Sequence, residues 1–209
     1  MLFSATLDGQ VNRLVQRYLR IAVRHEVAGE TELVPDLTHR FLAVHKLDRV
    51  QVAAAISRAA FRTLVFVRTK RGADRLAAQL RREGVQADAI HGDLRQNARE
   101  RALRNFVSGT TGVLVATDVA ARGIHVDAVD IVLHFDPPAD STTYVHRSGR
   151  TARAGQSGTV ATFVLWDQVS DIERLQKQIG VTEPIVEVFS NDPRLADLIS
   201  LGAPVRAAV

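Results

Sequence analysis

The feature that most constrains the fold is a regular alternation of short apolar runs with amphipathic stretches, which begins at Thr38. The run Thr63–Val67 is apolar and rich in β-branched residues, as is typical of a strand buried on both faces. Gly84 follows an amphipathic stretch at the position where a helix commonly ends. This alternation predicts an α/β fold with a mainly parallel sheet and helices on both of its faces.

The same patterns give approximate bounds for each element. We predict strands over residues 40–44, 63–67, 85–90, 112–117, 130–135, 159–165 and 185–189. We predict helices over residues 46–60, 71–83, 97–107, 142–150 and 169–179. Ligands of such folds meet the loops at the carboxyl ends of the strands, so the polar residues that follow the strands are the candidate site.

Composition excludes several classes of protein. The sequence has no Cys, so it holds neither a disulfide nor a Cys-ligated metal, and we expect no metal site. No apolar run approaches the length of a membrane span and no signal peptide is visible, so we expect a cytoplasmic protein without a membrane partner. The formal net charge of +4 permits nucleic-acid binding without establishing it.

An arginine cluster between two predicted strands is the strongest candidate site. Arg147, Arg150 and Arg153 are spaced by three, and on a helical turn this spacing places the guanidinium groups on one face. Arginine keeps its charge, and its planar fork fits phosphate oxygens. The cluster therefore predicts a polyanion site, and the alternative is a solvated basic helix end.

The segment Tyr-Val-His-Arg-Ser-Gly-Arg-Thr-Ala-Arg-Ala-Gly resembles motif VI of the DEAD-box RNA helicases. In that family it closes an ATP site from the second of two RecA-like domains. The resemblance implies that Arg150 and Arg153 are arginine fingers and that His146 lies at the interdomain contact. It also implies that Arg147 binds at the nucleotide site, meeting acidic residues of the first domain. Ala152 replaces a common Gly, which we interpret as a minor departure.

A second segment, residues 116–125, resembles motif V of the same family. The resemblance implies that Thr117 contacts an RNA phosphate. It implies that Asp118, Arg122 and Gly123 organise the turn that joins the RNA site to the ATP site.

One departure from motif V concerns the nucleotide. The family usually has Asp where this chain has His125, and that Asp binds the ribose. A histidine accepts a ribose hydrogen bond only when it is neutral. Asp127 lies about 6–7 Å further along an extended strand, so it is a poor substitute. We expect weakened or altered nucleotide recognition.

Two further segments resemble the family's RNA-side motifs. Residues 64–70 resemble motif IV, and Thr69 and Lys70 at a helix N-terminus can hold a phosphate. The alternative is that these residues only form the turn between a strand and a helix.

Residues 91–99 resemble the family's His-Gly-Asp and Gln-x-x-Arg elements. Gly92 allows close backbone approach, and Gln96 and Arg99 share a helix face from which both reach one sugar-phosphate strand. The alternative makes Asp93 an N-cap and Arg99 a surface charge.

The N-terminal residues resemble the end of a first RecA-like domain. Leu-Phe-Ser-Ala-Thr-Leu is similar to motif III, in which Ser4 and Thr6 would couple the ATP and RNA sites if that domain is present. The alternative is a simple turn or helix cap. The amphipathic helix predicted over residues 8–19 would normally pack on the first domain, so we expect it to cover itself on this domain or on a second copy of the chain, as a homodimer.

These observations predict three parts: residues 1–37 as motif III remnant, helix and linker, residues 38–190 as a RecA-like domain, and residues 191–209 as a tail that docks or frays. No phosphate loop of the form Gly-x-x-x-x-Gly-Lys-Ser/Thr and no Asp-Glu-Ala-Asp box occurs in the sequence. We therefore expect half of an ATP-dependent RNA helicase, which binds ATP with Mg²⁺ and RNA together with a missing N-terminal domain and is inactive alone. The alternatives are a free-standing RNA-binding module and half of a superfamily 2 DNA helicase.

Overall fold

The computed structural model describes residues 17–18, 37–121, 129–152 and 157–198. The chain divides into two compact units, Met1–Glu32 and Leu33–Val209, and nearly all described residues belong to the second. Ser4, Thr6 and most of the helix expected over residues 8–19 lie outside the described residues. Arg17 and Tyr18 are helical.

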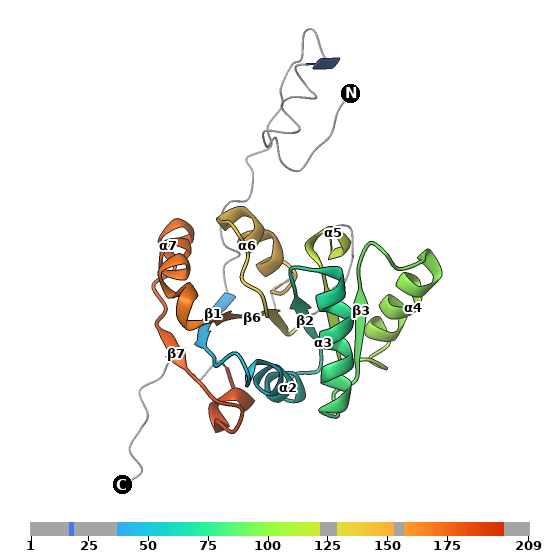
Figure 1. The fold of residues 1–209 in the computed structure, drawn as a ribbon, viewed down its shortest axis with the longest axis horizontal. Coiled ribbons are helices and arrows are strands. Elements are labelled where there is room, and N and C mark those ends of the chain that lie inside the picture. The colour runs from blue at the N-terminus through green and yellow to red at the C-terminus, as the bar shows by residue number, and fades with distance from the viewer. Residues whose placement is uncertain (1–16, 19–36, 122–128, 153–156, 199–209) are drawn as a thin grey trace. The chain divides into compact units, whose positions relative to one another are not determined.

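A seven-stranded sheet forms the centre of the second unit, and every strand pair is parallel. Its strand order is β3-β4-β2-β5-β6-β1-β7, which places β3 and β7 at the two edges (Figure 1). The predicted parallel sheet is confirmed. The strands are β1 (Leu37–Ala43), β2 (Thr63–Phe66), β3 (Ala87–Ile90), β4 (Val113–Ala116), β5 (Ile131–His134), β6 (Gly158–Val164) and β7 (Ile185–Glu187).

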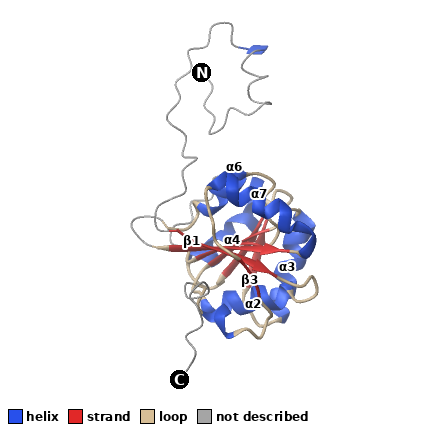
Figure 2. Ribbon diagram, turned by 90° about the vertical axis from the view of Figure 1, so that its left-hand side faces the viewer, coloured by secondary structure: helices blue, strands red, loops and turns tan. Residues whose placement is uncertain are grey.

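Helices cover both faces of the sheet, as the alternation predicted (Figure 2). Side chains of α2 and α3 enter one hydrophobic core, and side chains of α4, α5, α6 and α7 enter the other. The helices are α2 (Arg49–Ala59), α3 (Lys70–Arg82), α4 (Gln96–Val107), α5 (Asp118–Ala121), α6 (Ser141–Ser148) and α7 (Val169–Ile179), with short 3₁₀ turns η1 (Trp166–Gln168) and η2 (Pro193–Ala196). No helix among the described residues is long and apolar enough to cross a membrane.

Strand β2 shows how the sequence creates two cores. All four of its residues are buried. Leu64 and Phe66 belong to the core of the α4–α7 face, whereas Val65 and the following Val67 belong to the core of the α2–α3 face. Successive side chains of a strand point to opposite faces, so a continuous apolar run is needed where both faces are covered.

The first part of the C-terminal segment docks on the domain. Leu195 and Leu198 are buried in the core that contains α2. The Nε atom of Arg40 donates a hydrogen bond of 2.7 Å to the carbonyl of Leu198. Of the two possibilities for residues 191–209, docking therefore holds up to Leu198, and residues 199–209 lie outside the described residues.

The register of the central strands gathers their carboxyl ends at one edge of the sheet. Phe66 pairs with Ala116 and with His134, and Ile90 also pairs with Ala116. The residues that follow β2, β3, β4 and β5 therefore begin at the same level. This register brings the segments with candidate site residues together.

Helix α6 ends two residues earlier than predicted. It stops at Ser148, and Gly149 is its C-cap, with a backbone N–H that bonds to the carbonyls of Arg147 and Val145. Two residues further on from Arg150, Ala152 adopts a φ of 54°, in the left-handed region that favours glycine. The replacement of the family's Gly by Ala152 is therefore not a minor departure.

We expect Ala152→Gly to stabilise the protein by about 0.5–1 kcal/mol, because glycine adopts a left-handed conformation without a Cβ clash, partly offset by the entropy of the unfolded chain. Urea unfolding measures this difference. Ala55→Gly, within helix α2, is a control that should destabilise by about 1 kcal/mol. A loss of stability in Ala152→Gly would contradict the expectation.

Candidate functional site

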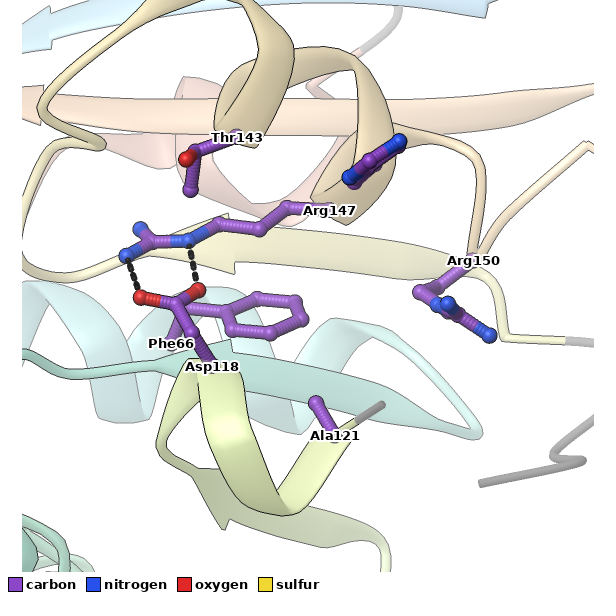
Figure 3. A pocket seen from close by; sticks show the side chains of 7 residues that line it. Phe66, Asp118, Ala121, Thr143, Arg147 and Arg150 are labelled. Carbon is purple, nitrogen blue, oxygen red and sulfur yellow. Dashed lines mark hydrogen bonds and ion pairs between the residues drawn. The ribbon is translucent and has the colours of Figure 1, made fainter. Parts of the chain in front are cut away.

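An ion pair between a buried arginine and a partly exposed aspartate joins helix α6 to the start of α5, just after strand β4. The Nε and Nη2 atoms of Arg147 donate to the two carboxylate oxygens of Asp118, at 2.6 and 2.9 Å (Figure 3). Its Nη1 atom donates to the carbonyl of Asp136 at 2.8 Å, and the guanidinium lies 5.0 Å from the ring centroid of Phe66. The Arg147 side chain is only 4% exposed.

Within its own domain Arg147 pairs with Asp118. The role that the resemblance implied, a contact with acidic residues of another domain at the nucleotide site, stays a prediction. Asp118 lies just after β4, at the carboxyl end of a parallel strand, where polar side chains are commonly found. The arginine comes from helix α6. The two charges compensate each other, so the pair fixes the position of α6 and offers little free charge to a ligand.

A shallow pocket lies beside this pair. Figure 3 shows Arg150 apart from the ion pair, in the turn that follows α6. Helix α6 ends at Ser148, before the second arginine, so Arg147 and Arg150 do not lie on one helix as predicted, although both line the same pocket. The pocket is lined by Phe66, Asp118, Ala121, Thr143, His146, Arg147 and Arg150.

Several predicted site residues cannot be placed in this pocket. Arg153, the second expected arginine finger, lies outside the described residues, as do Arg122, Gly123 and His125 of the motif V segment. Their roles stay predictions.

Asp136, which no sequence pattern singled out, links the turn after β2 to helix α6. Its carboxylate accepts hydrogen bonds from the backbone N–H of Arg68 at 2.9 Å and from Nη2 of Arg49 at 3.0 Å. Its carbonyl accepts from Arg147. Asp136 follows β5 by two residues, so the rule that directed attention to Asp118 could also have found it.

The predicted RNA-side residues meet at the ends of β2 and β3. Lys70 donates to Asp93 at 2.5 Å, and both side chains are exposed. A Cβ added at Gly92 would lie 3.7 Å from Cε of Lys70, an ordinary contact distance, so the domain itself does not require glycine there. A close approach by a ligand backbone remains a reason for glycine at this position.

The alternatives proposed for these residues have different outcomes. Thr69 is the N-cap of α3, and its hydroxyl accepts a hydrogen bond of 3.0 Å from the N–H of Gly72. The N-cap role therefore accounts for this side chain. The N-cap alternative for Asp93 is wrong, because Arg95 is the N-cap of α4. The hydrogen bond from Lys70 instead lowers the pKa of the Asp93 carboxyl below its ordinary value.

The remaining RNA-side residues lie on β4 and α4. Thr117 follows β4 and is 7% exposed. Gln96 begins α4 and donates to Glu100 at 3.0 Å, and Arg99 lies one turn further along the helix and is half-buried. The structure brings the strand-end residues to one edge, and their contacts with RNA stay predictions.

Residues 45–155 match the family of the helicase conserved C-terminal domain, which covers more than half of the chain. The DEAD-box ATP-dependent RNA helicase CshA of Geobacillus kaustophilus is 37% identical over 179 residues, which is 85% of this chain and 38% of that protein. The chain belongs to the DEAD-box RNA helicase family. It spans about two-fifths of the length of this curated relative.

Solved structures agree with the DEAD-box assignment and show that the fold is RecA-like. The structure of S. cerevisiae Dbp5 bound to RNA and ADP BeF3 matches with a TM-score of 0.78 and 28% identity, over 97% of this chain and 55% of that chain. The structure of the C-terminal domain of Dbp5 matches with a TM-score of 0.68 and 28% identity, over 79% of this chain and 98% of that chain. The chain is thus similar to the C-terminal domain of a DEAD-box protein.

A group of neutral polar side chains packs under helix α6 of this DEAD-box domain. Tyr144, on α6, shares a hydrogen bond of 2.7 Å with Nδ1 of His39 on β1. The ring of His134 stands edge-on to Tyr144, and its Nδ1 lies 3.0 Å from the hydroxyl of Thr162. Burial lowers the pKa of His39 to about 4 and lowers the pKa of His134 well below 6.5, so both rings are neutral at pH 7.

We expect Asp118→Asn to lower the free energy of unfolding by about 1–3 kcal/mol. The substitution leaves the buried Arg147 charge without a counter-ion, although the partial exposure of Asp118 reduces the cost. Asp171→Asn is the matched control, because it removes the carboxylate of the exposed Arg174 pair on α7 and should cost less than about 0.5 kcal/mol. If both variants lose the same free energy of unfolding in urea, the Arg147–Asp118 pair stabilises the protein no more than the exposed pair does.

The buried histidines predict a loss of stability in acid. Below pH 6.5 the unfolded chain protonates His39, whereas the folded chain does not until about pH 4, so acidification across this interval favours unfolding. The full interval corresponds to about 3 kcal/mol for this group. His39→Gln should flatten the pH dependence of the unfolding free energy, whereas the exposed His45→Gln should leave it unchanged. Parallel curves for His39→Gln and the unmodified protein would refute this origin.

Proposed function

We propose that this chain acts as the second half of an ATP-dependent DEAD-box RNA helicase. In this role it supplies the arginine fingers Arg150 and Arg153 and one wall of the groove for the RNA backbone. The observation that carries the proposal is the pocket in which Arg150 and His146 lie beside the Arg147–Asp118 pair, at the sheet edge that also holds the RNA-side residues. The relative Dbp5, solved with RNA and ADP BeF3, has the same fold.

The pocket residues fit one side of a nucleotide phosphate site. A guanidinium held at the site stabilises charge that builds on the transferring phosphoryl group, and so acts mainly on the transition state. Both Asp118 oxygens accept from Arg147, so we assign this pair to positioning α6 and not to holding Mg²⁺. ATP with Mg²⁺ would be held jointly with an N-terminal RecA-like domain, because the sequence contains neither a phosphate loop nor an Asp-Glu-Ala-Asp box.

The RNA-side residues suit backbone recognition. Lys70 provides a cation at the rim, Gly92 leaves space for close approach, and Gln96 and Arg99 offer donors from one helix. Such contacts fix a strand by its phosphates and sugars and carry little sequence information. The chain should therefore hold one RNA strand largely independently of its sequence.

Asp136 gives a physical route between the two sites. Its carboxylate holds the backbone at Arg68, which leads into Thr69 and Lys70, and its carbonyl holds Arg147 at the base of the pocket. RNA binding that shifts the turn after β2, at Arg68, would therefore disturb α6. In the same way, ATP binding at α6 would disturb the turn at Arg68. This route belongs to the described domain itself.

Three elements of the proposal concern residues outside the described part. Ser4 and Thr6 would couple the ATP and RNA sites when a first domain precedes them, and the helix of residues 8–19 would pack on that domain or on a second copy of the chain. His125 in place of the family's Asp would weaken or alter ribose recognition. These remain inferences from the sequence.

Phosphate release tests the proposal in two proteins: the 209-residue chain alone, and a two-domain protein in which a DEAD-box N-terminal domain precedes it. We expect no RNA-stimulated hydrolysis by the chain alone. In the active two-domain protein, Arg150→Ala should lower kcat by about 10³–10⁵-fold, the range measured for removal of an arginine finger. Arg174→Ala, on the exposed face of α7, is the control and should leave kcat unchanged.

Each result has a definite meaning. RNA-stimulated turnover by the isolated chain would overturn the assignment as half of an enzyme. Unchanged kcat in Arg150→Ala would overturn the arginine-finger role. RNA binding by a chain that forms no active enzyme with any DEAD-box N-terminal domain would favour a free-standing RNA-binding module.

A further inference from the structure

The net charge of the chain is concentrated on helix α3. Its thirteen residues include five basic side chains and only one acidic side chain, a net charge of +4. The whole 209-residue chain also has a formal net charge of +4, so the rest of the chain is neutral in sum. Helices α2 and α4 each carry a net charge of +2, so α3 has the largest excess of the described helices, and a local excess indicates an anionic partner better than a basic composition would.

The geometry of α3 turns these charges outward. Ala73, Leu76, Ala77 and Leu80 are buried, so they define the face that packs on the sheet. At about 100° per residue, Arg71, Arg75 and Arg82 lie on the opposite face, and all three are exposed. They span about 16 Å along the helix axis.

Asp74 offsets one of the three positive charges of this face but forms no ion pair with any of the arginines. Asp74, the one acidic residue of the helix, accepts from the buried His91 at 2.9 Å. Within the described part of the chain, Arg71, Arg75 and Arg82 have no hydrogen-bonded or ion-paired partner. These guanidinium groups are available to a ligand.

Helix stability does not explain the charges in the first turn. Cations near a helix N-terminus oppose the helix dipole, and this first turn contains Lys70 and Arg71 but no acidic residue. Only Arg81 and Arg82, in the last turn, are favoured by the dipole, and Arg81 also donates to the carbonyl of Ala87. The cations at the start of the helix therefore need another reason, and an anionic ligand provides one.

We propose that the outer face of α3, formed by Arg71, Arg75 and Arg82, is a second RNA-binding segment. It continues from the rim at Lys70 and Gly92 and holds the phosphates of a strand that extends beyond that rim. The proposal rests on the proposed function, because it extends the same RNA site along the helix. An RNA strand that passes Lys70 and Gly92 would continue along α3, away from the carboxyl ends of the β-strands.

The chemistry of the face favours RNA over an acidic protein. Between the arginines, the outward positions carry Asp74, Ala78 and Gln79, so the face has no apolar side chain larger than a methyl group. Protein interfaces depend on buried apolar or aromatic anchors, which this face lacks. Contacts with phosphates need only fixed cations and counterion release.

The test compares two double variants of the 209-residue chain that lose the same charge. Arg75→Gln with Arg82→Gln removes two cations from α3, and Arg174→Gln with Lys177→Gln removes two from the exposed side of α7. Fluorescence anisotropy measures binding of single-stranded RNA of about 6 and about 20 nucleotides, a short strand within the range that one strand-binding domain covers and a long one beyond it. Titrations are repeated over a series of salt concentrations.

We expect the α3 variant to bind the long RNA more weakly, with a plot of log K against log salt that is shallower by about 1.4, because two phosphate contacts are lost. Its affinity for the short RNA should match that of the unmodified chain. The α7 variant should resemble the unmodified chain with both RNAs.

Three outcomes would overturn the proposal. The first is equal behaviour of the α3 and α7 variants with the long RNA. The second is an equal loss on both RNA lengths, which would indicate a general charge effect. The third is that polyglutamate fully displaces the long RNA from the unmodified chain but not from the α3 variant, which would indicate an acidic protein partner. Failure of the unmodified chain to bind either RNA would overturn the RNA-binding function itself.

Discussion

The position of helix α6 depends on one buried cation. Arg147 is almost fully buried, and burial of an isolated charge costs far more than a domain of this size can tolerate. Three of its N–H groups are therefore committed, two to Asp118 and one to the carbonyl of Asp136. These acceptors follow β4 and β5, the two strands that flank β2, so they hold α6 at the carboxyl ends of the central strands and thereby place the turn with Arg150.

The interior beneath this helix is polar but uncharged. His39, His134 and Tyr144 contact one another through a hydrogen bond and ring packing, and burial holds both histidines in their neutral form. A protonated histidine there would repel Arg147 across a medium of low dielectric constant. This group of side chains thus lies next to a cation without adding charge, and because its histidines would have to be protonated in acid, it couples the stability of the site to pH.

Arginine has three separate uses in this domain. Arg147 and Arg49 are structural, since each donates to Asp136 at the strand ends. Arg150 lines the pocket, where a phosphoryl group is proposed to react. The arginines of α3 are exposed and lie along a single helix face. A high arginine content alone does not distinguish these uses, because they differ only in burial and in the acceptors that the fold supplies.

The sequence by itself determined the layers and the location of the site. Apolar periodicity is local, so the parallel sheet, its two covered faces and the strand ends that carry Lys70, Gly92, Asp118 and the arginines could be predicted, and motif resemblance identified the family. Tertiary structure decided the rest. The pairing of Arg147 with Asp118 joins residues 29 positions apart, and the role of Asp136 depends on two adjacent turns. Neither contact leaves a local pattern, because the first joins helix α6 to the start of α5 and the second joins the turns after β5 and β2, segments that only the folded sheet brings together.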